Sequence, residues 1–238
     1  MDKVSIVVPT VNEAENIARL IPQVEEVLKA NGIKGEIIVV DDKSDDGTAD
    51  ETKKQDARYG NVKLIERQVR DGLGNALKRG VKEAVNEYVI FMDADLSHEP
   101  KEVPNFVKAL KDYDVVVGSR YMRESKLERT MARKLISGTY NIVAKNLLGV
   151  RVTDLTSGYR GFRKTGFESL KISSSGPEIH AELIVKASVA GLRVGEIPVS
   201  YVDRLHGESK LNYMRIGPGY SKALLGGILS KASKLLRR

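Results

Sequence analysis

Short apolar runs alternate with stretches of helical periodicity through the first half of the 238-residue chain, and this alternation constrains the fold most strongly. The apolar runs are too short for helices and read as strands at Val4–Val8, Glu36–Val40, Lys63–Glu66, Tyr88–Met92 and Asp114–Val117. Helical patterns lie between them, at about 13–30, 47–58, 73–86 and 101–111. Pro22 should kink or restart the first of these helices. The pattern predicts an α/β fold with a Rossmann-like, mostly parallel sheet and helices on both faces.

The second half of the chain is less regular. A longer amphipathic helix is predicted at about 125–148, and Glu196–Val202 returns to strand character. Gly217-Pro218-Gly219 should break the chain before a last helix at about 220–237. We therefore expect one domain over residues 1–215 and a basic amphipathic helix over residues 216–238.

The positive charge of the chain is concentrated at its end. Of a net charge of +7, all is carried by residues 209–238, which contain no acid and these bases: Lys210, Arg215, Lys222, Lys231, Lys234, Arg237 and Arg238. A globally basic nucleic-acid binder would not have this distribution, so we expect no nucleic-acid partner. Because Leu224, Ile228 and Leu235 lie among these bases, the segment predicts a helix on a membrane surface or, alternatively, one packed on its own domain.

Other bulk features exclude several classes of protein. The chain has no cysteine, which excludes disulfides and thiolate metal sites. A strand-like run begins within a few residues of the start, so we expect no signal peptide. No apolar stretch near the end approaches the roughly 20 residues of a membrane span.

The first two predicted strands end in polar residues, where ligands of parallel sheets bind. The first ends in Pro9-Thr10-Val11-Asn12-Glu13, without the G-x-G-x-x-G of a dinucleotide enzyme, which counts against a dehydrogenase. This turn can also simply cap the next helix through Thr10 or Asn12. The second strand ends in four aspartates: Asp41, Asp42, Asp45 and Asp46. One or two of them can cap a helix, and a carboxylate there can also bind a base or ribose.

The fourth strand ends in the sharpest local signal, Asp93-Ala94-Asp95 followed by Leu96-Ser97-His98. An apolar strand delivers two carboxylates, two residues apart, to the edge of the sheet. Mg²⁺ and Mn²⁺ prefer oxygen ligands and usually take one or two carboxylates together with substrate phosphates. The segment therefore predicts a metal site that serves a diphosphate, in which His98 is more simply a turn residue than a ligand.

Three further segments carry weaker signals. The glycines of Asp71–Ala76 allow close approach of the backbone to a ligand. Arg133 and Ser137 share one helix face that can hold a phosphate or be plain solvated surface. Arg204 and Lys210 flank Gly207 in a loop that can close over a diphosphate or be an ordinary basic loop.

Taken in order, these motifs resemble the family 2 glycosyltransferases over about residues 4–211. The matching motifs are P-T-x-N-E, V-D-D-x-S-x-D-G-T, G-L-G-x-A, D-A-D-L-S-H-x-P, G-S-R-Y, R-K-L-I-S, D-x-x-S-G-Y-R and D-R-x-x-G-E-S-K-L. R-K-L-I-S and the G-E-S-K-L of the last motif are similar to the lipid-phosphate branch of that family, the dolichyl-phosphate mannose synthases. The resemblance implies a GT-A fold, with residues 1–215 as the catalytic domain.

The resemblance also implies roles for individual residues. The nucleoside pocket would be lined by Pro9, Val11, Glu13, Val40 and Asp42. The nucleotide-sugar would be contacted by Asp93 and Ala94, and its diphosphate and sugar by Arg120, Arg204 and Lys210. The metal, Mg²⁺ or Mn²⁺, would be held by Asp95 and Ser97, and the lipid phosphate by Arg133 and Ser137. Catalysis would then rest on Asp93, Asp95 and Arg204. Val11 and Ser97 depart from the family, which often has Tyr and in some members Gln there.

The function implied is the inverting transfer of mannose from GDP-mannose to dolichyl (polyprenyl) phosphate by a peripheral enzyme at the cytoplasmic face of the membrane. Some family members carry transmembrane hairpins beyond this point, so this chain would be a peripheral form, use a membrane-anchor partner, or be a shortened chain. Three alternatives stay open: a UDP-glucose donor, a saccharide or protein hydroxyl acceptor with Asp154 or Glu178 as base, and a non-catalytic lipid-surface module.

Overall fold

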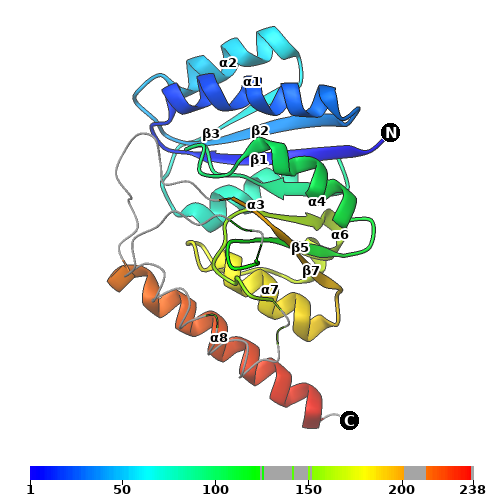
Figure 1. Ribbon diagram of the computed structural model, residues 1–238. Coiled ribbons are helices and arrows are strands. Elements are labelled where there is room, and N and C mark those ends of the chain that lie inside the picture. Colours follow the sequence, from blue (N-terminus) through cyan, green and yellow to red (C-terminus); the bar gives the residue numbers. More distant parts are fainter. Residues whose placement is uncertain (124, 126–140, 142–149, 151, 201–212, 237–238) are drawn as a thin grey trace.

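A seven-stranded sheet forms the centre of the protein in the computed structural model, which describes residues 1–123, 125, 141, 150, 152–200 and 213–236 (Figure 1). The strands are β1 (Lys3–Thr10), β2 (Lys34–Asp42), β3 (Val62–Arg67), β4 (Tyr88–Phe91), β5 (Val115–Ser119), β6 (Arg160–Arg163) and β7 (Val194–Pro198). Their order across the sheet is β3-β2-β1-β4-β6-β5-β7. β6 runs antiparallel to both β4 and β5, whereas the other pairs in the sheet are parallel.

Helices cover both faces of this sheet, as the alternating pattern predicts (Figure 1). The helices are α1 (Ala14–Ala30), α2 (Thr48–Tyr59), α3 (Leu73–Glu83), the 3-10 turn η1 (Pro100–Glu102), α4 (Val103–Ala109), α6 (Lys164–Ser169), α7 (Ile179–Ala190) and α8 (Tyr213–Leu236). α1 and α4 pack on one face, and α3, α6 and α7 pack on the other. The α/β class and the mostly parallel sheet are therefore confirmed.

Strand β1 shows why both faces are covered. Its side chains alternate between the two faces, as the pleat of a strand requires. Val4, Ile6 and Val8 join the cluster that contains α1 and α4, while Val7 joins the cluster that contains α3 and α7. All four side chains are fully buried, so the strand sequence lacks a polar face and fits only the middle of a sheet with two covers.

Two prolines lie inside continuous helices. α1 runs from Ala14 to Ala30 with Pro22 inside it, so the helix does not restart there. α8 begins at Tyr213 and passes through Pro218, although Gly217-Pro218-Gly219 predicts a break. Loss of one backbone hydrogen bond at a proline is tolerated where the rest of the helix is held by packing on its neighbours.

The elements missed by the sequence pattern are β6, α6 and α7. β6 has only four residues, and its alternation is hidden because Arg160 is fully buried. α7 is apolar around nearly its whole circumference, so it lacks the one-sided periodicity of a surface helix. The predicted helix at 125–148 and the loop at 201–212 lie almost wholly outside the described residues.

α8 packs beside α7 (Figure 1). Its apolar side chains lie in two different environments. Leu224 and Ile228 are partly buried against the core cluster that contains α7. Leu225 and Leu229 point outward and are 59% and 70% exposed. Packing of α8 on its own domain, one of the two predicted alternatives, therefore accounts for Leu224 and Ile228. The second apolar pair, Leu225 and Leu229, is left in solvent. No helix in the described part of the chain combines the length and hydropathy needed to cross a bilayer.

Gly80 tests the close packing of α3 on the sheet. A Cβ atom there would overlap a Cγ of Val7 and approach Val40 to 3.2 Å, whereas at Gly166 in α6 the nearest atom would lie at 3.7 Å. We expect Gly80→Ala to lower the free energy of unfolding by about 1–2 kcal/mol, because overpacking outweighs the gain in helix propensity. The control Gly166→Ala should be neutral or stabilising by up to about 1 kcal/mol. Urea denaturation measures both, and equal effects would contradict the close packing.

Candidate active site

A cavity of about 380 Å³ opens where the parallel strands β1, β2, β4 and β5 end. Its walls come from the ends of β1, β2 and β5, the turns after β3 and β4, the segment before β6, the starts of α3 and α7, and α8. It is lined by Pro9, Thr10, Val11, Glu13, Asp42, Arg70, Gly72, Leu73, Ala76, Asp93, Ala94, Asp95, His98, Arg120, Thr156, Gly158, Pro177, His180 and Tyr220. The site therefore lies at the carboxyl edge of the sheet, as the polar strand ends predict.

Asp42 is the acidic residue that β2 contributes to the cavity. Its carboxylate lies 2.8 Å from the Arg67 guanidinium, and the side chain of Arg70 donates to the backbone carbonyls of Asp42 and Lys43. Burial raises the pKa of Asp42, although the Arg67 charge opposes this rise. The carboxylate is thus held at one end of the cavity, where it can accept a hydrogen bond from a ligand.

The other aspartates of this turn shape the backbone around the cavity. Asp41 accepts the hydroxyl of Thr10 at 2.8 Å, which joins the ends of β1 and β2. Asp46 accepts the N–H of Ala14 at the start of α1 and that of Thr48 at the start of α2, both at 3.0 Å. Burial alone would raise the pKa of Asp46, but these hydrogen bonds lower it. One aspartate of the four thus caps two helices at once.

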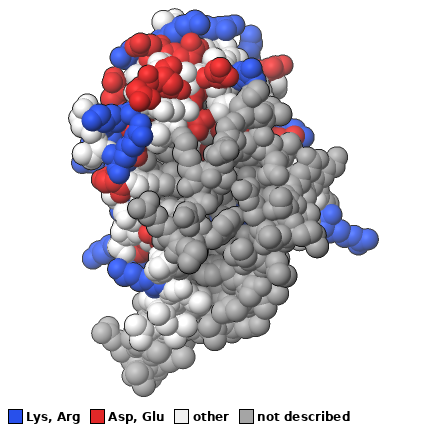
Figure 2. Space-filling model, turned by 90° about the vertical axis from the view of Figure 1, so that its left-hand side faces the viewer, with Lys and Arg blue, Asp and Glu red and all other residues white. Residues whose placement is uncertain are grey.

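Exposed carboxylates surround this end of the molecule. Asp45, Asp46 and Asp50 belong to the turn after β2 and the first turn of α2. Figure 2 shows acidic side chains gathered at the top of its face, the level at which α1 and α2 lie in Figure 1. Because Arg70 lines the same end of the cavity, this end offers both donors and acceptors, which suits a polar group such as a base or ribose.

The turn after β4 holds Asp93, Asp95 and Ser97 close together. Asp95 accepts the N–H of Ser97 at 3.1 Å, and both residues are 5% exposed or less. The Oγ atom of Ser97 is buried and has no hydrogen-bond partner among the described residues. His98 accepts the N–H of Asp93 through Nδ1 at 3.0 Å and stacks on Tyr159, so it fixes the turn.

These oxygen atoms fit a hard divalent cation. The described residues contain no cluster of three or more His, Asp or Glu side chains that could enclose a metal by themselves. A carboxylate at Asp95 and an unpaired hydroxyl at Ser97 are instead a partial oxygen set, of the kind that Mg²⁺ and Mn²⁺ complete with substrate phosphates and water. The donor set of this turn is therefore compatible with the predicted metal.

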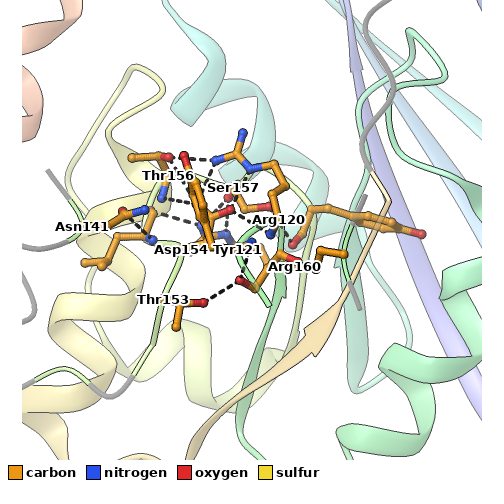
Figure 3. A network of polar contacts seen from close by, with 12 residues as sticks. Arg120, Tyr121, Asn141, Thr153, Asp154, Thr156, Ser157 and Arg160 are labelled. Carbon is orange, nitrogen blue, oxygen red and sulfur yellow. Dashed lines mark hydrogen bonds and ion pairs between the residues drawn. The ribbon is translucent and has the colours of Figure 1, made fainter. Parts of the chain in front are cut away.

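Arg120 faces the cavity from the end of β5 and is held there by a buried carboxylate (Figure 3). It donates to Asp154 through Nε at 2.6 Å and through a terminal nitrogen at 2.8 Å, and to the Thr156 hydroxyl at 2.8 Å. Burial of Asp154 would raise its pKa, but the charge and hydrogen bonds of Arg120 offset this and leave the pKa lowered. Both partners are therefore charged at neutral pH, and the guanidinium orientation is fixed.

A second arginine, Arg160, extends the polar network of Arg120 and Asp154 toward α7. Arg160, the first residue of β6, is fully buried and donates to the carbonyls of Ser157 at 2.9 Å and His180 at 2.5 Å. Burial lowers its pKa to about 10, partly opposed by Asp154, so the guanidinium is still charged at neutral pH. It therefore joins the segment before β6 to the first turn of α7.

The glycines at the start of α3 approach another part of the backbone closely, and Gly72 also lines the cavity, so the predicted approach to a ligand stays a prediction. A Cβ atom at Gly72 would overlap the backbone carbonyl of Ser175, and one at Gly74 would lie 2.6 Å from that of Ser174. The Ser175 carbonyl also accepts the N–H of Gly74 at 2.7 Å. The close approach shown here is thus between the start of α3 and residues 174–176, which directly precede the cavity residue Pro177.

The structure brings together most, but not all, of the residues that the sequence singled out. Those that line the cavity are Pro9, Val11, Glu13, Asp42, Asp93, Ala94, Asp95 and Arg120. The side chain of Val40 instead packs in the core beneath α3, and Ser97 is buried and does not line the cavity. Arg133, Ser137, Arg204 and Lys210 lie outside the described residues.

Several residues of the cavity wall were missed by the sequence reasoning. They are Arg70, Thr156, Gly158, Pro177, His180 and Tyr220. Only Thr156 and Gly158 lie within a quoted motif, D-x-x-S-G-Y-R, where the antiparallel strand β6 brings them to the carboxyl edge. Tyr220 comes from α8 and donates its hydroxyl to the Pro177 carbonyl at 3.1 Å. No local signal marks His180 or Tyr220, because helix packing alone brings them to the wall.

The sequence family that matches this chain, and three known proteins similar to the chain, are all described as glycosyltransferases. The model of the family described as glycosyl transferase family 2 matches residues 5–171. The chain is 37% identical over 213 residues to a dolichol-phosphate mannosyltransferase of Pyrococcus furiosus. The alignment covers 88% of this chain and 59% of the relative, so the chain spans less than two thirds of that protein. It is 33% identical to a dolichol-phosphate mannosyltransferase of Saccharomyces cerevisiae, covering 87% and 80%. An undecaprenyl-phosphate mannosyltransferase of Micrococcus luteus is 29% identical, covering 99% and 98%.

Solved structures agree on the fold. A glucosyl-3-phosphoglycerate synthase of Mycobacterium tuberculosis in complex with Mn²⁺, UDP and glucosyl-3-phosphoglycerate aligns with a TM-score of 0.68 at 21% identity, covering 97% of this chain and 80% of that one. A complex of the same enzyme with Mg²⁺ and UDP aligns with a TM-score of 0.69 at 20% identity, covering 97% and 79%. These likenesses show the GT-A type of fold.

The ion pair between Arg120 and Asp154 gives a prediction for stability. Asp154→Asn leaves a buried guanidinium without its counter-charge, so we expect the free energy of unfolding to fall by about 3–5 kcal/mol. The control Asp114→Asn removes a carboxylate whose partner Arg193 is largely exposed, and should cost about 1 kcal/mol or less. Urea denaturation at neutral pH compares the two variants.

The same pair predicts the pH dependence of stability. The pKa of Asp154 is lower in the folded state than in the unfolded state, so the contribution is present above about pH 4 and is lost as the pH falls through the folded-state pKa. The difference in stability between wild type and Asp154→Asn should therefore shrink in acid. A difference that does not change with pH would contradict a charged Asp154.

Proposed function

The chain belongs to glycosyltransferase family 2, and from this premise we propose that it transfers mannose from GDP-mannose to dolichyl phosphate or a related polyprenyl phosphate, with inversion at the anomeric carbon. The observation that carries the proposal is the arrangement of one cavity at the sheet edge. Asp42 lies at one end, Asp93 and Asp95 lie in the middle, and Arg120 lies on the far side. A nucleoside would lie at the Asp42 end, and the diphosphate and sugar would lie between the two aspartates and Arg120.

The residues of the chain would bind and orient this donor. Pro9, Val11 and Glu13 would pack against the base and Asp42 would accept from the nucleoside. Arg120 would donate to the diphosphate, and its fixed orientation would stabilise the charge that develops as GDP leaves. Arg204 and Lys210 would add positive charge from their loop. Asp93 and Ala94 would contact the nucleotide-sugar.

Asp95 and Ser97 would hold Mg²⁺ or Mn²⁺ against the same diphosphate. Support for this comes from the buried carboxylate of Asp95 and the unpaired hydroxyl of Ser97. A bound cation of this kind would neutralise charge on the departing diphosphate. The protein would contribute the position of the ligands, which the Asp95 to Ser97 hydrogen bond holds in place.

A phosphate acceptor is favoured over a hydroxyl acceptor because neither of the two candidate bases, Asp154 and Glu178, is placed to act on an acceptor. Asp154 is fully buried and bound to Arg120, so it is not available to deprotonate an acceptor. Glu178 does not line the cavity and accepts the N–H of Gly176 at 3.1 Å. A phosphate is already anionic at neutral pH and needs no strong base, so catalysis would rest on positioning and electrostatics. Arg133 and Ser137 would bind this phosphate.

The acceptor lipid requires contact with a membrane, at its cytoplasmic face in this proposal. α8 exposes Leu225 and Leu229, and Lys222 on the same helix is also exposed. An apolar pair next to basic residues favours the interface of an anionic membrane. α8 would thus serve both as a packed helix of the domain and as a peripheral membrane contact, with or without an anchoring partner.

The transferase activity is tested by transfer of labelled mannose into an organic extract. The full chain would be mixed with Mg²⁺ or Mn²⁺, dolichyl phosphate in vesicles and labelled GDP-mannose. We expect label in the lipid phase that is lost with EDTA, and Asp95→Ala should lower the rate by at least about 100-fold, because a ligand at the diphosphate is lost. The control Asp45→Asn changes an exposed carboxylate outside the cavity and should keep the rate.

Each other outcome of this assay has a definite meaning. Label from UDP-glucose alone would replace the donor and keep the fold and the lipid acceptor. Transfer to a free saccharide instead of the lipid would replace the acceptor. Near-normal transfer by Asp95→Ala would remove the metal role of that residue. Binding to vesicles without transfer from either donor would favour the lipid-surface module.

The membrane role of α8 is tested by vesicle sedimentation. We expect Leu225→Ser with Leu229→Ser to weaken binding to anionic vesicles about tenfold or more, since partial burial of two leucines in lipid supplies at least about 1.4 kcal/mol. The control Val85→Ser removes an apolar side chain that is 80% exposed and lies far from α8 in sequence. Equal loss in both variants, or no loss in the first, would contradict the assignment.

A further inference from the structure

His180 is a titratable residue of the cavity wall that the proposed chemistry does not use. It belongs to the first turn of α7, and its backbone carbonyl is fixed by the Arg160 guanidinium at 2.5 Å. Its ring meets Phe91 edge to face with centroids 6.3 Å apart. The residue is 5% exposed, and the cavity supplies the open side of its surroundings.

One polar atom of this ring is unsatisfied. Nδ1 of His180 is buried and has no hydrogen-bond partner among the residues that the structure describes. A buried polar atom without a partner costs about 1–3 kcal/mol, and an apolar side chain of similar shape would avoid that cost. A histidine at such a position is therefore explained better by a ligand than by the packing of α7.

The charge state of the ring indicates which chemical group it binds. Burial lowers the pKa of His180 well below its usual value, and the positive charges of Arg160 and Arg120 lower it further. The imidazole is thus neutral at neutral pH and offers one donor and one acceptor. A hydroxyl group matches this pair, whereas a phosphate would favour the cation of Arg120 on the same wall.

The sheet order places His180 at the end of the cavity opposite the nucleoside. Asp42 follows β2, on one side of β1, and Asp93 follows β4 on the other side. The segment before β6 supplies Thr156 and Gly158 one strand further on, and Arg160 ties that segment to His180. A donor that binds with its nucleoside at β2 would therefore bring its hexose toward His180.

We propose that His180 determines donor specificity by hydrogen bonding a hydroxyl of the hexose. This inference rests on the proposed function, because it takes the cavity to be the site of a nucleotide-sugar. His180 acts in ground-state recognition and positioning of the sugar, and no bond of the reaction is made or broken at its ring. The apolar wall of Phe91 behind the ring fixes its plane.

Three substitutions separate recognition from packing. Leucine removes both nitrogens, asparagine keeps a polar atom near Nδ1, and glutamine keeps one near Nε2. Titration calorimetry would measure binding of GDP and of GDP-mannose to the full chain with Mg²⁺, and of UDP and UDP-glucose in parallel. Thermal melting of each variant would check folding, and His180→Leu should melt no lower than wild type, since it removes an unpaired buried nitrogen.

We expect His180→Leu to weaken GDP-mannose about five- to tenfold and to leave GDP within about twofold. His180→Asn should recover most of this loss, and His180→Gln should not. Deoxy analogues of GDP-mannose identify the hydroxyl: the analogue that lacks it should bind wild type and His180→Leu equally, because the two changes remove the same interaction.

Two results would overturn the inference alone: equal weakening of GDP and GDP-mannose, or GDP-mannose binding that no substitution changes. Failure of the proposed function would be recognised from the binding of nucleotide-sugars to the wild-type protein, without any substitution. Preference for UDP-glucose would overturn the donor and move the same test to that sugar. If the wild-type protein binds neither nucleotide-sugar more tightly than the corresponding nucleotide, both the proposed function and the role of His180 are overturned.

Discussion

The buried ion pair between Arg120 and Asp154 connects the parts of the chain that form the cavity. Arg120 follows β5 and Asp154 precedes β6, so the pair joins two segments that the antiparallel strand β6 brings to one edge of the sheet. Neither charge is stable in the interior without the other, since burial of a single ion costs several kcal/mol. The pair therefore fixes a cation toward the cavity where a diphosphate would bind, and it also excludes Asp154 from acting as a base.

The remaining walls depend on contacts of similar closeness between elements distant in sequence. Residues 174–176 approach α3 so closely that only glycine fits at positions 72 and 74. The same loop carries Pro177, whose carbonyl accepts the Tyr220 hydroxyl from α8. A helix that exposes Leu225 and Leu229 thus also closes the cavity. If α8 rests on a membrane, the donor site lies next to the surface in which a lipid acceptor would be held.

The fold and the polar strand ends could be predicted from sequence because both follow from local patterns. Alternating apolar runs and helical periodicity give the parallel sheet, and the carboxyl ends of β1, β2 and β4 then place Asp42, Asp93 and Asp95 together. The resemblance to family 2 glycosyltransferases, which the family match confirms, added Pro9, Val11, Glu13 and Arg120 to the same edge. Val40 shows the limit, because its side chain packs in the core beneath α3.

The sequence by itself determined the order of strands and helices as far as β5, the carboxylates at the sheet edge, and the charge excess at the end of the chain, since each is encoded by neighbouring residues. The tertiary structure decided the rest. The four-residue strand β6 is stabilised by pairing with β4 and β5 rather than by its own propensity. Leu224 and Ile228 turn inward because α7 offers an apolar surface, which leaves Leu225 and Leu229 outside. His180 acquires an unpaired nitrogen beside a cavity only through the packing of α7, which no local pattern encodes.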